Sequence, residues 1–148
     1  MKTEVKRILI VDDNPKDVEL TIAALAENNL ANEIIVAEDG EEALDYLHRR
    51  SKFADYDIGN PAVILLDIKM PKMNGIEVLE YIRSKPIFKS IPVIMVTSSG
   101  EERDLVESYK YGSNAYMIKP VDIAQFNDAI KVLGQFWIVI NQQPIAIM

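Results

Sequence analysis

Residues 8–20 have the sequence ILIVDDNPKDVEL, in which an apolar run, a polar turn and a helical pattern follow one another directly. The first four residues are apolar and mostly β-branched, which is typical of a strand buried on both faces of a parallel sheet. Asn14 is a favourable helix N-cap, and Pro15 suits the first helical position. The stretch therefore predicts a β-α unit whose turn contains two carboxylates, Asp12 and Asp13.

The same alternation of apolar run and helical pattern occurs four more times along the chain. Repeated β-α order with right-handed crossovers predicts a doubly wound α/β sandwich around a parallel sheet. Sheets of this kind bind ligands at the carboxyl ends of their strands, so the chemistry is expected just after each run. We expect strands at residues 8–11, 34–37, 62–66, 93–96 and 115–118, and helices at 15–27, 41–50, 76–84, 101–111 and 122–140.

Two further local patterns lead to testable expectations. The helix at 101–111 has apolar residues at Leu105, Val106 and Tyr109, which we expect to face the core, and Gly112 is a natural C-cap. The polar stretch 51–60 is expected to be a long loop before the third strand.

The composition excludes several classes of protein. The chain has 148 residues, of which 49% are hydrophobic and 26% charged, as expected for one soluble domain. A net charge of −7 argues against binding to the nucleic-acid backbone. No cysteine and a single histidine exclude disulfides, thiolate sites and multi-histidine zinc centres. The sequence has neither a bilayer-spanning run nor a secretory signal, so we expect a cytoplasmic protein without a membrane partner.

Polar side chains follow four of the five expected strands. They are Asp12 and Asp13 after the first, Asp67 after the third, Thr97 after the fourth and Lys119 after the fifth. Carboxylates that share a pocket raise one another's pKa unless a cation lies between them, and Mg²⁺ prefers such oxygen ligands. A carboxylate beside Mg²⁺ and a lysine is arranged to attack a phosphoryl group.

Four separated motifs resemble the signature of the response-regulator receiver family, which is CheY-like. They are ILIVDDN at 8–14, LLDIKMP at 65–71 followed by Asn74-Gly75, VIMVTS at 93–98, and Lys119-Pro120. The likeness runs from about residue 5 to 137, with the motifs in the family's order. It implies a flavodoxin-like (βα)5 fold with strand order 2-1-3-4-5. It also implies a single receiver domain over residues 1–148, with a core at about 5–137 and a C-terminal tail at 138–148.

The resemblance implies a phosphorylation site with a metal ion. Asp67 would accept the phosphoryl group and would also be a metal ligand. Asp13 would bind Mg²⁺ directly, and Asp12 would bind it directly or through water. The backbone carbonyl of Lys69 would complete the protein ligands, and Mn²⁺ would be able to replace Mg²⁺.

The remaining family positions imply phosphate-binding, switch and structural roles. Lys119 would pair with the phosphoryl oxygens, and Thr97 would move to hydrogen-bond the phosphoryl group. Tyr116 would change rotamer with Thr97, or would be an ordinary half-buried aromatic residue. Gly75 and a cis Lys119-Pro120 peptide would shape the neighbouring loops.

A narrower resemblance points to the partners. Residues 13–21, the stretch 51–60 and Phe136-Trp137 are similar to stand-alone regulators that partner phytochrome-type histidine kinases. This implies a sensor histidine kinase as phosphodonor in a two-component phosphorelay. With no output domain expected after residue 148, the signal would pass by binding a downstream protein. The apolar residues of the last helix or tail are also expected to form a homodimer contact.

Ordinary structural explanations exist for each site residue. Asp12 and Asp13 would suit an exposed acidic loop, and Asp67 a turn. Lys119 would suit a solvated strand end, and Thr97 has a simple preference for strands. The joint occurrence of all five favours the site.

Three other functions compete with the switch. An aspartyl phosphatase needs a second acid two residues after the nucleophile, where this chain has Lys69. A flavin or nucleotide module needs a phosphate-binding loop after the first strand, where Asp12 and Asp13 would repel phosphate. A degenerate scaffold is disfavoured because every site position is filled. We therefore expect a switch that slowly hydrolyses its own aspartyl phosphate, not a metabolic enzyme.

Overall fold

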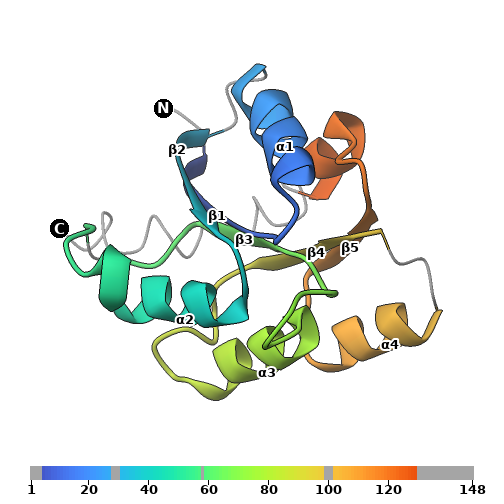
Figure 1. Ribbon diagram of the computed structural model, residues 1–148. Coiled ribbons are helices and arrows are strands. Elements are labelled where there is room, and N and C mark those ends of the chain that lie inside the picture. Colours follow the sequence, from blue (N-terminus) through green and yellow to red (C-terminus); the bar gives the residue numbers. More distant parts are fainter. Residues whose placement is uncertain (1–4, 28–30, 58, 99–101, 130–148) are drawn as a thin grey trace, which may run out of the picture.

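The computed structural model describes residues 5–27, 31–57, 59–98 and 102–129. Five parallel strands form one sheet in the order β2-β1-β3-β4-β5, which confirms the predicted topology (Figure 1). Each predicted apolar run forms one strand, although Ala62 of the run 62–66 precedes its strand. The strands are β1 (Val5–Val11), β2 (Ala31–Ala37), β3 (Val63–Leu66), β4 (Val93–Thr97) and β5 (Ala115–Ile118).

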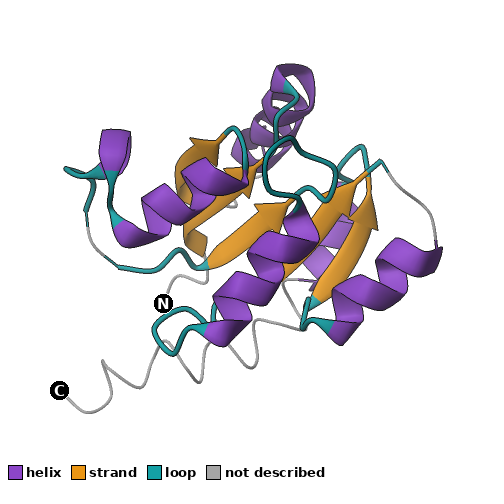
Figure 2. Cartoon of the chain, turned by 60° about the horizontal axis from the view of Figure 1, so that its bottom comes forward, coloured by secondary structure: helices purple, strands orange, loops and turns teal. Residues whose placement is uncertain are grey.

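Helices cover both faces of the sheet. Helix α1 and the helical residues 123–129 lie on one face, and α2, α3 and α4 lie on the other (Figures 1 and 2). Their bounds are α1 (Pro15–Glu27), α2 (Gly40–His48), α3 (Gly75–Ser84) and α4 (Glu102–Lys110), with a short 3-10 helix η1 (Ser51–Phe53) after α2. No helix within the described ranges has the length and apolar character of a membrane span.

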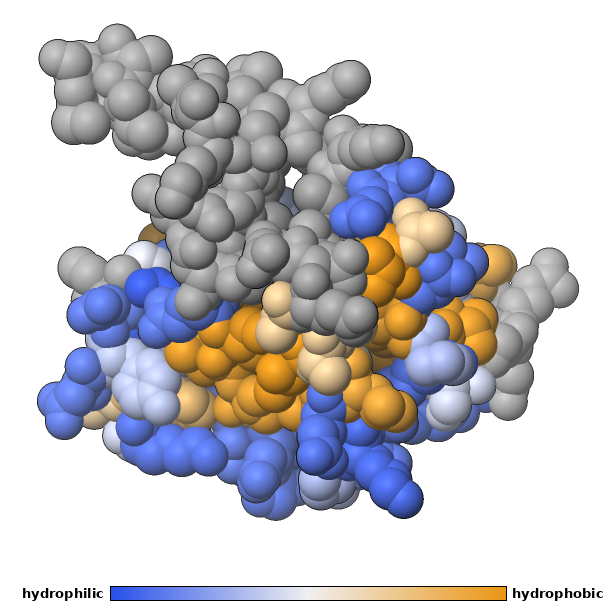
Figure 3. Space-filling view, turned by 90° about the horizontal axis from the view of Figure 1, so that it is seen from above, coloured by the Kyte–Doolittle hydropathy of each residue, from blue (hydrophilic) through white to orange (hydrophobic). Residues whose placement is uncertain are grey.

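The sheet separates two apolar cores. In β1, Leu9 and Val11 point into the core beneath α2 and α3, whereas Ile8 and Ile10 point into the core beneath α1. This alternation explains the continuous apolar run in the sequence, because both faces of the strand are buried. On the α1 face, apolar surface gathers between polar margins (Figure 3). The partly buried apolar residues packed against that core are Ile22, Ile34, Val36, Ala62, Ala115, Val121 and Ala129.

Side-chain caps set the helix starts. The Asn14 side chain accepts hydrogen bonds from two backbone N–H groups at the start of α1, which confirms it as the N-cap. Asn74 and Glu77 form a capping box, so α3 begins one residue earlier than predicted. Asp39 caps α2 in a similar way. The predicted end of α2 was wrong, because Arg49 has a left-handed conformation and stops the helix at His48.

The stretch 51–60 is more structured than the predicted long loop. Phe53 is buried, and its ring meets that of Tyr46 edge-on at 5.4 Å. The Arg49 guanidinium lies over the Tyr46 ring and donates a hydrogen bond of 2.6 Å to the Gly59 carbonyl oxygen. Aromatic packing and this arginine fix the segment against the end of α2, which local composition did not indicate.

The predicted apolar face of α4 was wrong. Val106 and Tyr109 are 57% and 52% exposed, and Leu105 is only partly buried. The buried positions are Asp104 and Ser108, one helical turn apart. The helix therefore turns Val106 and Tyr109 outward. The predicted helix 122–140 is described only as far as 129, so the proposed dimer contact of the last helix and tail lies outside the described residues.

Candidate functional site

Backbone pairing continues past the strand ends and brings the predicted site residues together. The Asp67 N–H donates to the Val11 carbonyl at 2.9 Å, so Asp67 lies beside Asp12 at the start of the loop. The Lys119 N–H donates to the Thr97 carbonyl at 2.8 Å. The carboxyl ends of β1, β3, β4 and β5 thus lie together, as the topology requires. They bring the side chains of four residues to one end of the sheet: Asp12, Asp67, Thr97 and Lys119.

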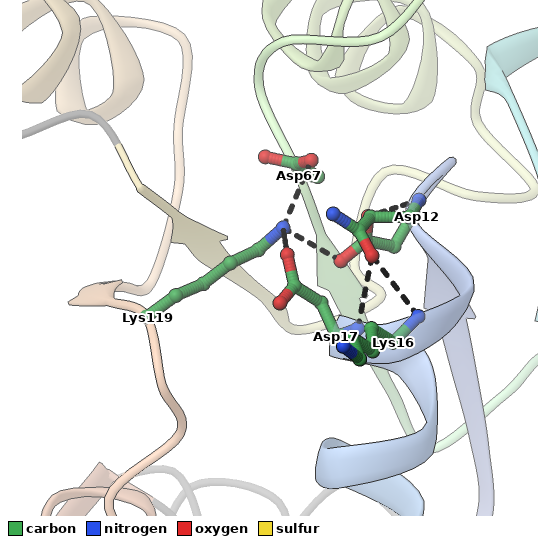
Figure 4. Close-up of polar contacts among 6 residues, drawn as sticks. Asp12, Lys16, Asp17, Asp67 and Lys119 are labelled. Atoms are coloured by element: carbon green, nitrogen blue, oxygen red, sulfur yellow. Dashed lines mark hydrogen bonds and ion pairs between the residues drawn. The ribbon is translucent and has the colours of Figure 1, made fainter.

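Lys119 is the centre of this cluster (Figure 4). Its Nζ lies 2.8 Å from Asp12 Oδ2, 3.0 Å from Asp17 Oδ2 and 3.1 Å from Asp67 Oδ2. Burial by itself would lower the pKa of Lys119. Hydrogen bonds to Asp12 and Asp17 and the charge of Asp67 outweigh it, so the pKa is raised well above its usual value. Lys119 is therefore a fixed positive charge.

The Asp67 carboxylate is buried, with only 6% of the residue exposed. Burial raises its pKa above the usual value; the positive charge of Lys119 opposes this shift, and the negative charge of Asp12 adds to it. Hydrogen bonds to Lys119 and Thr97 also favour the charged form. Three carboxylates, those of Asp12, Asp17 and Asp67, surround the single ammonium of Lys119, so an added cation would be favourable.

Three carboxylates fit a divalent cation. Asp12, Asp13 and Asp67 each offer an oxygen, and these oxygens all lie within 4.8 Å of one another. Asp12 and Asp67 are buried, whereas Asp13 is exposed and would leave room for water ligands. Hard oxygen donors at this spacing suit Mg²⁺ or Mn²⁺.

The loop after β3 forms one wall of an open groove next to the carboxylates. Asp13, Lys69 and Asp104 are among its lining residues. The side chain of Lys69 is exposed, and its Nζ lies 3.9 Å from Asp104 Oδ2. That side chain therefore lies beside Asp104 of α4, and the predicted contribution of Lys69 to the metal site is its backbone carbonyl alone.

Two glycines allow the loop after β3 to pack closely. A Cβ on Gly75 would lie 2.1 Å from the Asp67 carbonyl oxygen, and a Cβ on Gly40 would lie 2.6 Å from the Met73 carbonyl oxygen. The chain therefore needs glycine at both positions. The sequence indicated Gly75 through the family motif, whereas Gly40 was missed because its close contact is with a loop distant in sequence.

The remaining predicted residues lie around the site. The Lys119-Pro120 peptide is cis. Tyr116 is partly buried and packs against the core beneath α2 and α3. Its change of rotamer stays a prediction. Among the described residues, the predicted set is gathered at one end of the sheet.

Asp17 is the site residue that sequence reasoning missed. The Asn14 N–H donates to Asp12 Oδ1 at 2.9 Å, and Asn14 Oδ1 in turn accepts from the Asp17 N–H at 3.2 Å. The cap of α1 thus links the first carboxylate to the first helical turn. The available signal was position: Asp17 is the third residue after the N-cap, where a side chain of the first turn returns toward the strand end.

Comparisons with known proteins agree with this geometry. The profile of the family described as "Response regulator receiver domain" matches residues 8–131. Response regulator Rcp1 of Synechocystis sp. is 31% identical over 141 residues, which span 95% of each chain.

Solved structures give the same result. The bacteriophytochrome response regulator RtBRR is 55% identical, with a TM-score of 0.79 over 88% of this chain and 78% of that one. The phosphorylated cyanobacterial phytochrome response regulator RcpA is 36% identical, with a TM-score of 0.73 over 91% and 94%. The Mn²⁺-bound form of Rcp1 has a TM-score of 0.71 at 31% identity, covering 93% of each chain.

Proposed function

This chain belongs to the response regulator receiver domain family, and from that premise we propose that Asp67 accepts a phosphoryl group from a phosphohistidine of a sensor histidine kinase. The observation that carries the proposal is the placement of Lys119 Nζ 3.1 Å from Asp67 Oδ2, within a cluster of carboxylates. The phytochrome regulators among its relatives support a phytochrome-type kinase as the donor.

In the proposed transfer, an Asp67 carboxylate oxygen forms a bond to phosphorus. The bond from phosphorus to the donor's imidazole nitrogen breaks, and the imidazole leaves with the electron pair. Lys119 receives the phosphoryl oxygens, and the Thr97 hydroxyl donates to one of them. Mg²⁺, with Mn²⁺ as its substitute, would be held by Asp12, Asp13, Asp67 and the Lys69 carbonyl, and would supply positive charge to the phosphoryl oxygens.

The signal would leave the domain at the surface of α4 and β5. Thr97 ends β4 and is fully buried, and Tyr116 lies in the adjacent strand, paired with Met95. A shift of Thr97 toward the phosphoryl group would open space into which Tyr116 turns. The exposed apolar residues Val106 and Tyr109 support a protein-binding surface there. The domain would exist in two conformations, and both phosphorylation and the bound partner would favour the same one.

The direct test uses Asp67→Ala with acetyl phosphate as donor. The unsubstituted protein should acquire one phosphoryl group in the presence of Mg²⁺, seen by intact mass, and Asp67→Ala should acquire none. Asp55→Ala removes an exposed carboxylate from the 51–60 segment and should be labelled normally. Labelling of Asp67→Ala at the normal rate would refute the assignment, as would an unlabelled parent protein.

We also propose one receiver domain over residues 1–148 that forms a homodimer through the last helix or the tail. The apolar residues of the final segment and the apolar surface on the α1 face support it. Sedimentation of a chain stopped after Asn141 tests the part played by the tail. We expect the shortened chain to sediment with the mass of a monomer at matched concentration. A dimer would exclude residues 142–148 from the contact.

A further inference from the structure

Resting on the proposed function, we infer that Asp17 is a positioning residue for phosphoryl transfer, which holds the Lys119 ammonium opposite Asp67. Its Oδ2 lies 3.0 Å from Lys119 Nζ, although the two residues are 102 positions apart. The motif residues alone would give Lys119 two carboxylate partners, Asp12 and Asp67. Asp17 supplies a third, so each of the three ammonium hydrogens has an acceptor.

The position of Asp17 makes it a firm anchor. Its backbone N–H is bound by the N-cap Asn14, which fixes the first turn of α1. Its side chain is 33% exposed, whereas that of Lys119 is 12% exposed, so the pair lies at the mouth of the pocket. A lysine side chain has a flexible four-carbon stem, and a partner at the mouth keeps its charged end from turning outward to water.

The other two partners of Lys119 have further tasks in the reaction. One carboxylate oxygen of Asp67 becomes bonded to phosphorus, and Asp12 is a proposed metal ligand. Asp17 is outside the group of three carboxylates that fits a metal ion. Its contact with Lys119 can therefore persist while the ammonium exchanges Asp67 for phosphoryl oxygens. Lys119 then arrives at the transition state already oriented, which is the condition for effective electrostatic stabilisation.

A simple charge effect of Asp17 predicts the opposite result. A further negative charge at the mouth would repel an incoming phosphoryl donor, so its removal would speed up the reaction. Positioning predicts that removal slows it. The sign of the change in rate separates the two explanations.

The first measurement is the rate of labelling by acetyl phosphate at saturating Mg²⁺. We expect Asp17→Ala to slow labelling about tenfold, because a displaced lysine forfeits part of its orientation. Asp17→Asn retains an oxygen that accepts a hydrogen bond, so its labelling rate should lie between those of the parent protein and Asp17→Ala. Glu19→Gln removes an exposed carboxylate from the same helix and should leave the rate unchanged. Thermal unfolding of each variant identifies any loss of fold.

The second measurement examines whether Asp17 acts through Lys119. In a Lys119→Arg background, where the point ammonium is replaced by a longer planar group, Asp17→Ala should slow labelling by less than twofold. In the parent protein without divalent ions, the Lys119 ammonium resonance should be visible by ¹⁵N NMR. It should broaden in Asp17→Ala through exchange with water, and should be retained in Glu19→Gln.

Specific outcomes would overturn the inference. They are a parent-like or faster rate in Asp17→Ala, an equal slowing in the Lys119→Arg background, or an unchanged Lys119 resonance. If the parent protein is not labelled at all, the proposed function fails instead. If the parent is labelled and Asp67→Ala is not, the proposed function stands and Asp17 is judged separately.

Discussion

At the scale of single residues, the site combines burial with excess negative charge. Asp67 is disfavoured as an anion by burial and by Asp12, while Lys119 is held charged by its three carboxylate neighbours. Perturbed pKa values of this kind are common where a protein arranges groups for chemistry. Sequence motifs identified these residue types, but their burial and distances follow from the way the strands meet.

Another titratable residue, His48, gives a pH-dependent prediction. Burial first, and then Arg50 and Lys85, lower its pKa below the usual 6.5. Its Nε2 lies 2.7 Å from the Tyr81 hydroxyl oxygen, and its ring packs edge-on against Phe88. His48, in the last turn of α2, is therefore mostly neutral at pH 7.

Because the pKa of His48 is lower in the folded state, the unfolded chain binds its proton first. Its contribution to stability is full above pH 6.5 and falls as the pH drops below that value. Urea unfolding measured from pH 7.5 to 5 should show this loss. In His48→Gln, the free energy of unfolding should change less steeply with pH. An equal slope in both proteins would contradict the assignment of the pH dependence to His48.

Gly75 gives a steric prediction. Its added Cβ would lie 2.1 Å from the Asp67 carbonyl oxygen, so Gly75→Ala must displace the loop after β3. We expect a loss of about 2 kcal/mol or more in the free energy of unfolding and slower labelling. Gly59→Ala is the comparison. Gly59 has a positive φ, but its added Cβ would make only an ordinary contact, 3.8 Å from Arg7 Nη1, so the variant should lose about 1 kcal/mol and label normally.

At the scale of elements, α4 behaves differently from its sequence pattern. Apolar spacing predicted that Val106 and Tyr109 face the core, yet Asp104 and Ser108 do. Helix periodicity states which residues share a face, but the rotation of a helix against the sheet depends on all the residues it packs on. In α3, by contrast, the apolar residues Val78, Leu79 and Ile82 are all buried.

The orientation of α4 predicts a contrast between two helices. Val106→Ser should change the free energy of unfolding by less than about 0.5 kcal/mol, since the side chain is 57% exposed. Leu79→Ala in α3 should cost about 2–5 kcal/mol, because it leaves a cavity in the core. Denaturant melts of both variants test this. A large loss in Val106→Ser would show that its side chain is covered by contacts beyond those described.

At the scale of the whole molecule, the sheet gathers carboxylates from separate β-α units, so a cation should stabilise the fold. On the proposed function, Mg²⁺ would bind the assembled pocket and not the unfolded chain, so the melting temperature should rise with the Mg²⁺ concentration. Asp13→Asn removes an exposed ligand and should weaken that rise, whereas Glu19→Gln should keep it. A melting temperature independent of Mg²⁺ in the parent protein would count against the metal site.

The sequence by itself determined the β-α order, both buried faces of β1, the N-cap Asn14 and the motif residues of the site. These are local properties, since burial on both faces and capping leave their pattern within a few neighbouring residues. Only the tertiary structure decided which face α4 buries, the packing of Phe53, and the pairing of Asp17 with Lys119. Those depend on contacts between segments far apart in the chain, up to 102 residues for that pair, and no local periodicity specifies them.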